Sequence, residues 1–425
     1  MSKDSTRSIR PLIVAEHASA KFGGEALIPF QYFKYLRQLN VDVHLLVHER
    51  TRKELCDAFA DDSDRLHFVV DSCINIWCYK LGRFMPDRLA AFTLGAVSHF
   101  DTQFRQRRMT QGLVRERRFD VVHEPIPVSP KLPSMMFGLG VPVIIGPMNG
   151  GMDYPPNYNL TGRFERASIS ALRWTSALWN RIMPGKLHAA LIMVANKRTY
   201  EALPPNIKHK RILEFVENGV DLDRFNFEPR SAASENVSII CVGRLVDWKR
   251  VDLLINACRK LVGKVSFRVD IVGDGPVRGA LEGQVEQMGL TSYVRFHGWL
   301  PQSAAADLLR HADIMVHPSM RECGGAAVLE AMASGLPVIA AKWGGPADYV
   351  VENTGILIPP GSPCKFVEEL ANAILWMAKN PNTRIEMGKA GRDRVRVFYD
   401  WRVKAPALVK IYEEAAASVN NDVDV

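Results

Sequence analysis

The sequence predicts an α/β protein of the two-domain type, each domain a doubly wound, Rossmann-like sheet. The chain has 425 residues, of which 47% are hydrophobic and 24% charged. A single hydrophobic core stops growing at about 250–300 residues, so this length favours two domains. Short apolar runs alternate with helical patterns along the chain, which is the order that builds a parallel sheet covered by helices. We therefore expect two such domains facing a central cleft.

The domain boundary is expected where this alternation breaks. Residues 228–236 are polar, contain Pro229 and show no periodicity, as is typical of an interdomain linker. The expected division is an N-terminal domain (1–226), a linker (227–236), a C-terminal domain (237–400) and a final helix (401–425) that returns to the N-terminal domain.

Each expected strand is a short apolar run. The run from Ile9 to Ala15 is followed by a glycine pair, by helical periodicity from Leu27 to Leu39, and by a further run from Val41 to Val47. The remaining runs of strand length are 120–123, 141–145 and 191–195 in the first half, and 237–242, 267–272, 294–297, 314–317 and 337–341 in the second.

Composition and cysteine spacing exclude several classes of protein. The apolar run from Pro11 to Ala15 is shorter than the about 7–15 residues of a secretory signal. No run reaches the roughly 18 apolar residues of a membrane-spanning helix. The seven cysteines are scattered without zinc-site spacing, so we expect reduced, buried thiols. These features predict a cytoplasmic protein, either free or peripheral on the inner face of the membrane.

The formal net charge of +8 predicts an anionic partner. No nucleic acid is expected, because the sequence has no nucleic-acid-binding module and no basic motif interleaved with aromatic residues. Residues 105–118 carry six arginines, and residues 163–186 mix basic residues with Trp and Leu. Such segments either lie on an anionic membrane surface or pack on the domain with snorkelling arginines, and the sequence leaves both interpretations open.

Candidate binding residues gather just after strands of the second half, where doubly wound domains bind ligands. Arg244 and Lys249 follow the first of these strands, and cations at a strand end stabilise a departing diphosphate. Gly324 and Gly325 precede a helical pattern, so backbone N–H groups at a helix start can approach phosphate or sugar oxygens.

Two carboxylates complete this group of residues. Glu322 lies before the glycine turn, and Glu330 lies about two turns into the helix. A carboxylate accepts hydrogen bonds from adjacent hydroxyls, so Glu322 can face a sugar ring and Glu330 a ribose. Each residue alone is as readily explained by an ordinary turn or a solvated surface. The ligand interpretation is favoured because four strand-end segments follow in order: 242–250, 272–276, 296–301 and 317–335.

The first half offers three further strand-end features. A glycine pair follows the first strand and opens a helix, which predicts either an anion site or a tight turn. A histidine ends the strand at 120–123, and a glycine-rich loop after the strand at 141–145 favours close approach of a ligand. The residues concerned are Gly23, Gly24, His123, Asn149, Gly150 and Gly151.

These motifs resemble the GT-B glycosyltransferases, specifically the large retaining family 4 (glycosyl transferases group 1). Glu322 and Glu330 match the E-x7-E spacing of that family, and residues 243–249 match its G-R-L-x-x-x-K motif. The V-G-D-G-P and F-x-G-x-L-P segments are present, and residues 217–225 look like the N-G-V-D-x-x-x-F entry to the linker. The family commonly has an aromatic residue in the glycine turn, whereas Cys323 and two glycines stand here. This departure leaves the shape of the sugar pocket undefined.

The resemblance implies retaining transfer of a sugar from a nucleotide-diphosphate-sugar donor to a glycan or lipid-linked acceptor, in polysaccharide or glycoconjugate biosynthesis. It implies Glu322, Arg244, Lys249 and His123 as catalytic residues, with His123 near the transferred sugar. Acceptor contacts are expected at Asn149, Gly150 and Gly151. Donor-binding residues are expected to be Gly23, Gly24, Gly243, Arg244, Lys249, Trp299, Leu300, Glu322, Gly324, Gly325, Ala326, Ala327 and Glu330.

We expect neither a cofactor nor a metal, because no Asp-x-Asp motif follows a predicted strand. No second carboxylate is placed as a nucleophile, the arrangement of retaining hydrolases. The resemblance instead implies front-face attack, in which a donor phosphate oxygen takes the acceptor's proton. Two alternatives stay open: another GT-B activity of the epimerase or disaccharide synthase type, and a nucleotide-sugar-binding subunit without turnover.

Overall fold

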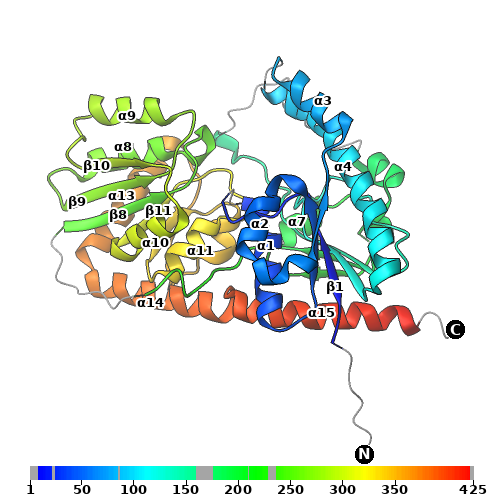
Figure 1. Ribbon diagram of the computed structural model, residues 1–425. Helices are drawn as coiled ribbons and strands as arrows, with labels where there is room; N and C mark the ends of the chain where they lie inside the picture. Colours follow the sequence, from blue (N-terminus) through cyan, green and yellow to red (C-terminus); the bar gives the residue numbers. More distant parts are fainter. Residues whose placement is uncertain are drawn as a thin grey trace, which may run out of the picture. The chain divides into compact units, whose positions relative to one another are not determined.

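The computed structural model of the chain describes residues 8–21, 24–84, 87–158, 176–208, 210–227 and 236–421. The chain divides into two compact α/β units (Figure 1). The first comprises residues 1–151, 162–217 and 405–425, and the second comprises residues 152–161 and 218–404. The first unit therefore ends its main segment at Glu217, before the linker expected at 227–236, and residues 152–161 belong to the second unit.

The described part of the first unit contains a seven-stranded parallel sheet in the order β3-β2-β1-β4-β5-β6-β7. Its strands are β1 (Pro11–Val14), β2 (His44–His48), β3 (Leu66–Val69), β4 (Val121–Glu124), β5 (Val143–Met148), β6 (Leu191–Val194) and β7 (Ile212–Glu214). The apolar runs predicted in this half correspond to β1, β2, β4, β5 and β6. The sequence did not predict β3 and β7, which lie at the two edges of the sheet.

Helices surround this sheet. In the described residues they are α1 (Leu27–Gln38), α2 (Arg52–Ala58), α3 (Cys73–Gly82), α4 (Asp87–Arg117), α6 (Gly185–His188) and α7 (Lys197–Ala202). The last helix of the chain, α15 (Trp401–Asn421), is the long red helix of Figure 1. From Ala405 onward it belongs to the first unit, where the side chain of Tyr412 is fully buried.

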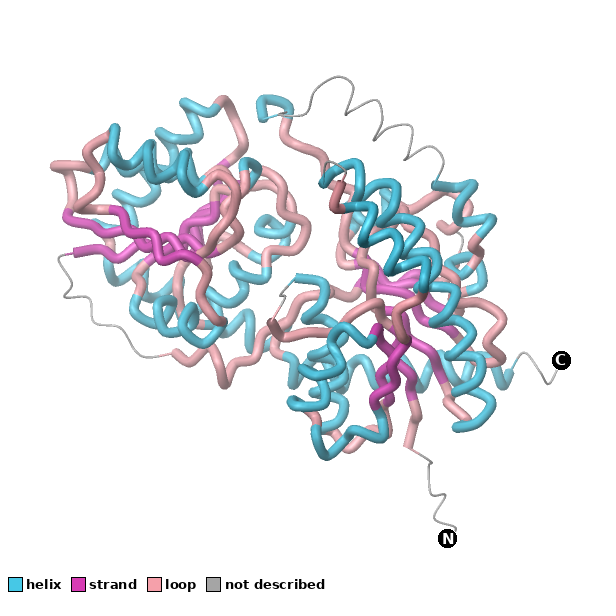
Figure 2. The backbone as a smooth tube through the Cα atoms, turned by 45° about the horizontal axis from the view of Figure 1, so that its top comes forward, coloured by secondary structure: helices cyan, strands magenta, loops and turns pink. Residues whose placement is uncertain are grey.

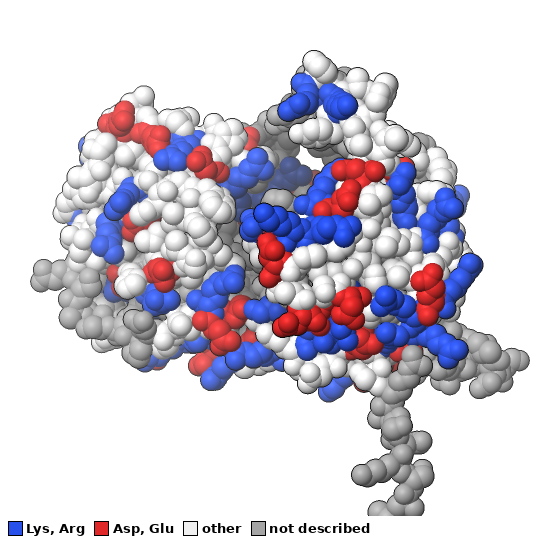
Figure 3. Space-filling view, in the orientation of Figure 1, with Lys and Arg blue, Asp and Glu red and all other residues white. Residues whose placement is uncertain are grey.

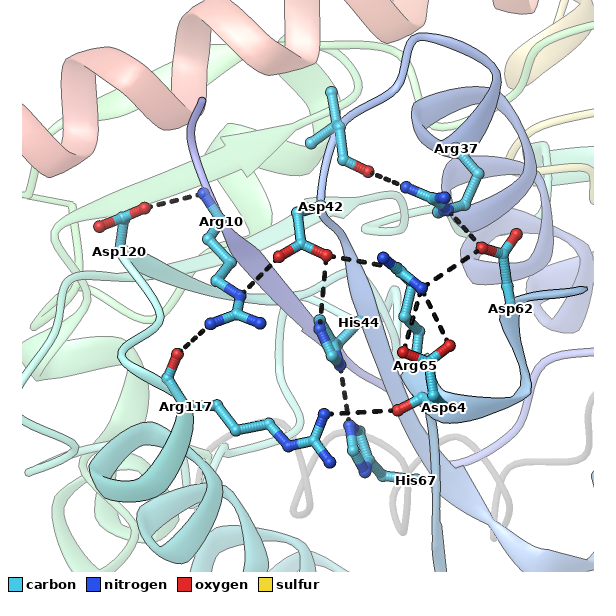
Figure 4. Close-up of polar contacts among 11 residues, drawn as sticks. Arg10, Arg37, Asp42, His44, Asp62, Asp64, Arg65, His67, Arg117 and Asp120 are labelled. Atoms are coloured by element: carbon cyan, nitrogen blue, oxygen red, sulfur yellow. Dashed lines mark hydrogen bonds and ion pairs between the residues drawn. The ribbon is translucent and has the colours of Figure 1, made fainter. Parts of the chain in front are cut away.

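A network of charged side chains lies at the amino ends of β1 to β3 (Figure 4). The carboxylate of Asp42 pairs with Arg10 at 2.8 Å and with Arg65 at 3.2 Å. Beside it, Nδ1 of His44 lies 3.0 Å from Nε2 of His67, and the two rings stack. Burial, reinforced by nearby arginines, lowers the pKa of both histidines to about 4. Both rings are therefore neutral at neutral pH.

Residues 236–358 of the second unit form a six-stranded parallel sheet in the order β10-β9-β8-β11-β12-β13. Helices cover both of its faces (Figure 2). The strands are β8 (Asn236–Val242), β9 (Ser266–Val272), β10 (Val294–Gly298), β11 (Ile314–His317), β12 (Val338–Ala341) and β13 (Gly355–Ile358). The helices are α8 (Val251–Leu261), α9 (Arg278–Gln287), α10 (Gln302–His311), α11 (Ala326–Ala333), α12 (Gly345–Tyr349), α13 (Pro363–Lys379) and α14 (Pro381–Phe398). The five strands predicted in this half are confirmed, and only the edge strand β13 was not predicted.

Residues 152–158, which we call the strap, pack on the second unit although they lie far from it in sequence. The ring of Tyr158 is 2% exposed, packs edge-on against Phe366 and lies 5.2 Å from the guanidinium of Arg250. The indole N–H of Trp343 donates to the carbonyl of Asp153 at 2.9 Å. The second unit is therefore completed by a segment from the first half of the chain.

Candidate functional site

The loops that follow β8, β9 and β10 are stacked backbone to backbone at the carboxyl end of the second sheet. The amide of Gly243 donates to the carbonyl of Val272 at 3.0 Å, and the amide of Gly273 donates to that of Gly298 at 2.8 Å. A Cβ at Gly273 would lie 1.9 Å from the carbonyl oxygen of Gly243. Gly273 is required by this close approach, so the V-G-D-G-P segment supports the loop that carries Arg244 and Lys249.

Lys249, Glu322 and His317 form one charged cluster beside these loops. The ammonium of Lys249 makes an ion pair with Oε2 of Glu322, and Nε2 of His317 lies 3.3 Å from the same oxygen. Burial raises the pKa of Glu322, but the charge of Lys249 and the His317 hydrogen bond outweigh it and bring that pKa to about 2. Glu322 is thus ionised at any physiological pH. The structure brings together two predicted residues and adds His317, which the sequence analysis missed.

The glycine turn after Glu322 leads directly into α11. Gly325 has φ of +86° and precedes the first helical residue, Ala326. A Cβ at Gly325 would lie 3.2 Å from Cγ of Glu322. A second glycine pair packs behind this turn: the amide of Gly345 donates to the carbonyl of Glu322 at 2.8 Å, and a Cβ at Gly345 would lie 2.0 Å from the carbonyl of Gly324. This second pair was not singled out in the sequence, although two adjacent glycines after a strand are a usable signal.

The second glutamate of the E-x7-E spacing is held by an amide rather than by a direct ion pair. Oε1 of Glu330 accepts a hydrogen bond from Nε2 of Gln302 at 2.7 Å, and the guanidinium of Arg224 donates to Oε1 of Gln302. Burial raises the pKa of Glu330, and the hydrogen bond from Gln302 opposes that rise. Sequence reasoning missed Gln302 and Arg224. Arg224 does lie inside the N-G-V-D-x-x-x-F segment, whereas Gln302 is simply the residue after the F-x-G-x-L-P segment.

The remaining predicted donor residues lie at the same end of the second sheet. Trp299, directly after β10, has 65% of its surface exposed, and Leu300 is half-buried. Arg244, after β8, is exposed. Ala326 and Ala327 are the half-buried first residues of α11. These positions leave an aromatic face, a guanidinium and the start of a helix available to a ligand.

His123 does not have the environment that we expected. Its ring is fully buried, with Nε2 2.6 Å from the carbonyl of Gly146 and Nδ1 2.6 Å from the hydroxyl of Tyr412. A carbonyl only accepts, so the proton is on Nε2 and Nδ1 accepts from the tyrosine. Burial lowers the pKa of His123 to about 4. Both ring nitrogens are engaged within the fold, so in this structure His123 ties β4 to β5 and α15 and offers no atom to a sugar hydroxyl.

The predicted acceptor loop is also held by internal contacts. The side chain of Asn149 is buried and donates to Glu217 at 2.7 Å. A Cβ at Gly150 would lie 2.6 Å from Pro130, and one at Gly151 would lie 2.4 Å from Cβ of Ala202. Packing within the first unit accounts for these three residues, and the Asn149 side chain is not directed to a ligand.

The loop after β1 already contains an internal anion. Gly23 lies outside the described residues, and Gly24 has φ of +55° at the start of a short 3-10 turn. The carboxylate of Glu54 accepts from the hydroxyl of Ser19 at 2.7 Å and from the amide of Ala20 at 2.9 Å. A carboxylate of the chain itself therefore binds the polar groups that lie just before this turn.

Two basic residues of these segments, Arg107 and Lys186, are engaged in packing where the structure describes them. The guanidinium of Arg107 lies 4.1 Å above the ring of Phe137 and donates to its carbonyl at 3.0 Å. Residues 163–175 lie outside the described residues. In the described remainder of that segment, Trp179 stacks on Phe100 of α4, and the buried ammonium of Lys186 donates to two backbone carbonyls. For Arg107 and Lys186, packing on the domain is the interpretation that holds.

Residues 223–394 match the family model described as glycosyl transferases group 1. The chain is 32% identical over 242 residues to a D-inositol 3-phosphate glycosyltransferase of Saccharomonospora viridis, which covers 52% of this chain and 53% of that protein. It is 31% identical over 215 residues to a GDP-mannose-dependent alpha-(1-6)-phosphatidylinositol monomannoside mannosyltransferase of Mycobacterium tuberculosis, which covers 46% and 54%. The chain thus spans about half the length of these curated relatives.

Solved structures align with nearly the whole chain. HepE of Anabaena, solved with UDP and glucose, has a TM-score of 0.64 at 17% identity and covers 96% of this chain and 100% of that one. Sucrose-phosphate synthase of Thermosynechococcus elongatus has a TM-score of 0.68 at 18% identity, with the same coverage. At this identity the likeness establishes the fold. Residues 223–394 therefore resemble the glycosyl transferases group 1 family, in a chain whose two Rossmann-like units give it the GT-B fold.

Proposed function

We propose that this chain is a retaining glycosyltransferase that moves a sugar from a nucleotide-diphosphate-sugar to a glycan or lipid-linked acceptor. The observation that carries the proposal is the cluster of Lys249, Glu322 and His317 beside a glycine turn and a helix start, within the segment that matches the family. Charged groups fixed in this way at a strand end are suited to a diphosphate and a sugar. The names of the relatives favour glycoconjugate biosynthesis as the pathway.

The proposed reaction exchanges one C–O bond for another at the anomeric carbon. The bond from that carbon to the donor phosphate breaks, and the acceptor oxygen bonds to the carbon on the same face. The acceptor's proton passes to a donor phosphate oxygen. Lys249 and Arg244 stabilise the negative charge that develops on the diphosphate. Glu322 orients the sugar through its hydroxyls, and Glu330 binds the ribose.

The donor is identified by a panel of UDP-, GDP- and ADP-sugars, measured by binding and by release of the nucleoside diphosphate. UDP-glucose is tested first because HepE was solved with UDP and glucose. GDP-mannose is tested next because a relative is named for it. Each reaction is run with and without EDTA, and we propose that chelation leaves the rate unchanged. The anomeric configuration of the product, followed by NMR, tests retention.

Replacing Glu322 tests the site itself. We expect Glu322→Ala to lower turnover by about 10²–10³-fold, a typical loss when a charged group that acts in the transition state is removed. The control is Glu282→Ala on α9, whose half-exposed carboxylate pairs with Arg278, and which should retain full activity. Full activity in Glu322→Ala would refute the assignment. A wild-type protein that binds a donor without turnover would instead favour a non-catalytic subunit, and an isomerised donor would favour an epimerase.

A further inference from the structure

Helix α3 presents its polar face to the protein and its apolar face to solvent. Asn75 and Cys78 are buried, as is Ser72, which caps the helix. On the other side, Trp77 and Tyr79 each have 67% of their surface exposed. Helices on the surface of a globular protein normally have the opposite arrangement, with the apolar stripe facing the core.

Specific hydrogen bonds hold α3 in this orientation. Nδ2 of Asn75 donates to the hydroxyl of Thr102 on α4 at 3.3 Å, and the hydroxyl of Ser98 donates to Oδ1 of Asn75 at 3.0 Å. The hydroxyl of Ser72 accepts the amide of Asn75 at 2.9 Å. Turning the apolar side inward would break these bonds and leave buried polar atoms without partners, which costs about 1–3 kcal/mol for each group. The outward apolar face is therefore a specified feature of the fold.

The outward side chains combine exposed apolar and aromatic groups with basic ones, and we call this set the α3 face. Phe84, just after the helix, has 88% of its surface exposed. The guanidinium of Arg83 lies 5.5 Å from the ring of Tyr79. In Figure 3 the lobe at the top, formed by α3, carries Lys and Arg among uncharged side chains on the face shown. The members of the α3 face are Val70, Ile74, Ile76, Trp77, Tyr79, Lys80, Arg83 and Phe84.

We propose that the α3 face docks on the surface of a lipid bilayer that contains anionic lipid. Trp and Tyr place amphipathic rings at the level of the headgroups, and neighbouring Lys and Arg pair with anionic headgroups. Asp71, just before the helix, is already paired with Arg50 at 2.9 Å. Every helix in the described ranges is too short or too polar to cross a bilayer. The α3 face therefore lies on the membrane rather than in it, independently of the proposed activity.

Vesicle co-sedimentation of the full-length chain tests this proposal without any donor. Wild type should bind phosphatidylcholine–phosphatidylglycerol vesicles and be released by salt. Trp77→Ser/Phe84→Ser should lower the partition coefficient by at least about tenfold, because two large apolar side chains are lost from the contact. Lys80→Gln/Arg83→Gln should lower it by about fivefold for each charge, and only on anionic vesicles. The matched control is Val397→Ser/Phe398→Ser on α14, whose side chains are 52% and 58% exposed.

Melting temperatures of all variants should equal that of wild type, because the changed side chains are exposed. A loss of vesicle binding then reports on the α3 face and not on a loss of folding. Equal binding by Trp77→Ser/Phe84→Ser and wild type would overturn the proposal. Failure of the wild-type protein to bind any of the vesicles would also overturn the proposal. A dimer that Trp77→Ser/Phe84→Ser dissociates, without vesicle binding, would likewise overturn it and assign the face to a second copy of the chain.

Discussion

The two glutamates of the E-x7-E spacing have different electrostatic environments. Glu322 pairs with a lysine and a histidine, which hold its pKa at about 2. Glu330 meets the amide of Gln302, and burial raises its pKa. A carboxylate fixed in the charged state suits a partner that carries or develops charge, whereas one held by an amide suits neutral hydroxyls. The contrast agrees with the division proposed above, with the sugar at Glu322 and the ribose at Glu330.

At this scale we predict that Gln302→Met weakens donor binding. The amide of Gln302 fixes one oxygen of Glu330 and leaves the other for a ligand, so its loss frees the carboxylate to rotate. We expect KM for the donor to rise about tenfold with kcat nearly unchanged, as for lost uniform binding. Steady-state kinetics measure this effect. Gln284→Met, which removes an amide that bonds Asn256 on α8, should leave both constants unchanged, and a fall in kcat alone in Gln302→Met would contradict the positioning role.

Residue identity and spacing were sufficient to single out Lys249 and Glu322, which the fold brings together, because each of their motifs is local in the sequence. They were insufficient for His123. Its partner Tyr412 is 289 residues away, so the occupation of Nδ1 is visible only in the folded chain. Gln302 was missed for a related reason, since nothing in the sequence around it indicates a contact with Glu330.

At the scale of elements, glycines at the carboxyl ends of the strands let neighbouring loops approach closely. The loops after β8, β9 and β10 are joined by the Gly243–Val272 and Gly273–Gly298 hydrogen bonds. Because Lys249 lies in the first of these loops, its position depends on the backbone of the other two. The loops thus form a shared platform for the charged cluster.

We predict that Gly273→Ala destabilises the protein by about 2–4 kcal/mol. Its φ is +137°, and the new Cβ would meet backbone rather than a movable side chain. The control is Gly283→Ala inside α9, where a Cβ meets nothing within 4 Å. That change should stabilise by about 0.5–1 kcal/mol, because alanine favours the helix. Urea unfolding measures both, and equal free energies of unfolding for the two variants would refute the close-approach argument.

Interior strands were predictable, and the three missed strands of the two described sheets all lie at edges. Strands such as β4 and β11 are buried along their whole length and read as continuous apolar runs. By contrast β3, β7 and β13 are edge strands with partly exposed residues, so they do not require a continuous buried apolar run. Helix α3 was also not predicted, because its apolar residues face outward.

At the scale of the whole molecule, we predict a loss of stability in mild acid. His44 and His67 have pKa values of about 4 in the fold, and on unfolding these return to the ordinary value of 6.5. As the pH falls, the unfolded chain therefore binds protons before the folded one. The stability that the two neutral rings contribute is full above about pH 6.5 and is lost as the pH falls towards 4. Between neutral pH and about pH 5, each of the two rings should cost the fold about 2 kcal/mol of stability.

Urea midpoints of wild type and His67→Gln at neutral pH and at about pH 5 test this prediction. The variant keeps a polar group beside His44 but removes one titrating ring, so its stability should fall less steeply with acid. His311→Gln, at an exposed position, should follow the wild-type curve. A pH dependence as steep in His67→Gln as in wild type would show that the acid response arises elsewhere.

The strap has a consequence for recombination between related chains. A chimera joined near residue 217 takes every later residue from one parent chain. It keeps the strap, residues 152–158, of the other parent chain. Tyr158 would then meet a foreign Phe366 and Arg250, and Asp153 a foreign Trp343. Exchange of the second unit as an intact module therefore requires the transfer of two separate segments, residues 152–161 and residues 218–404. Libraries built with a single junction would divide a buried tyrosine from its own packing partners.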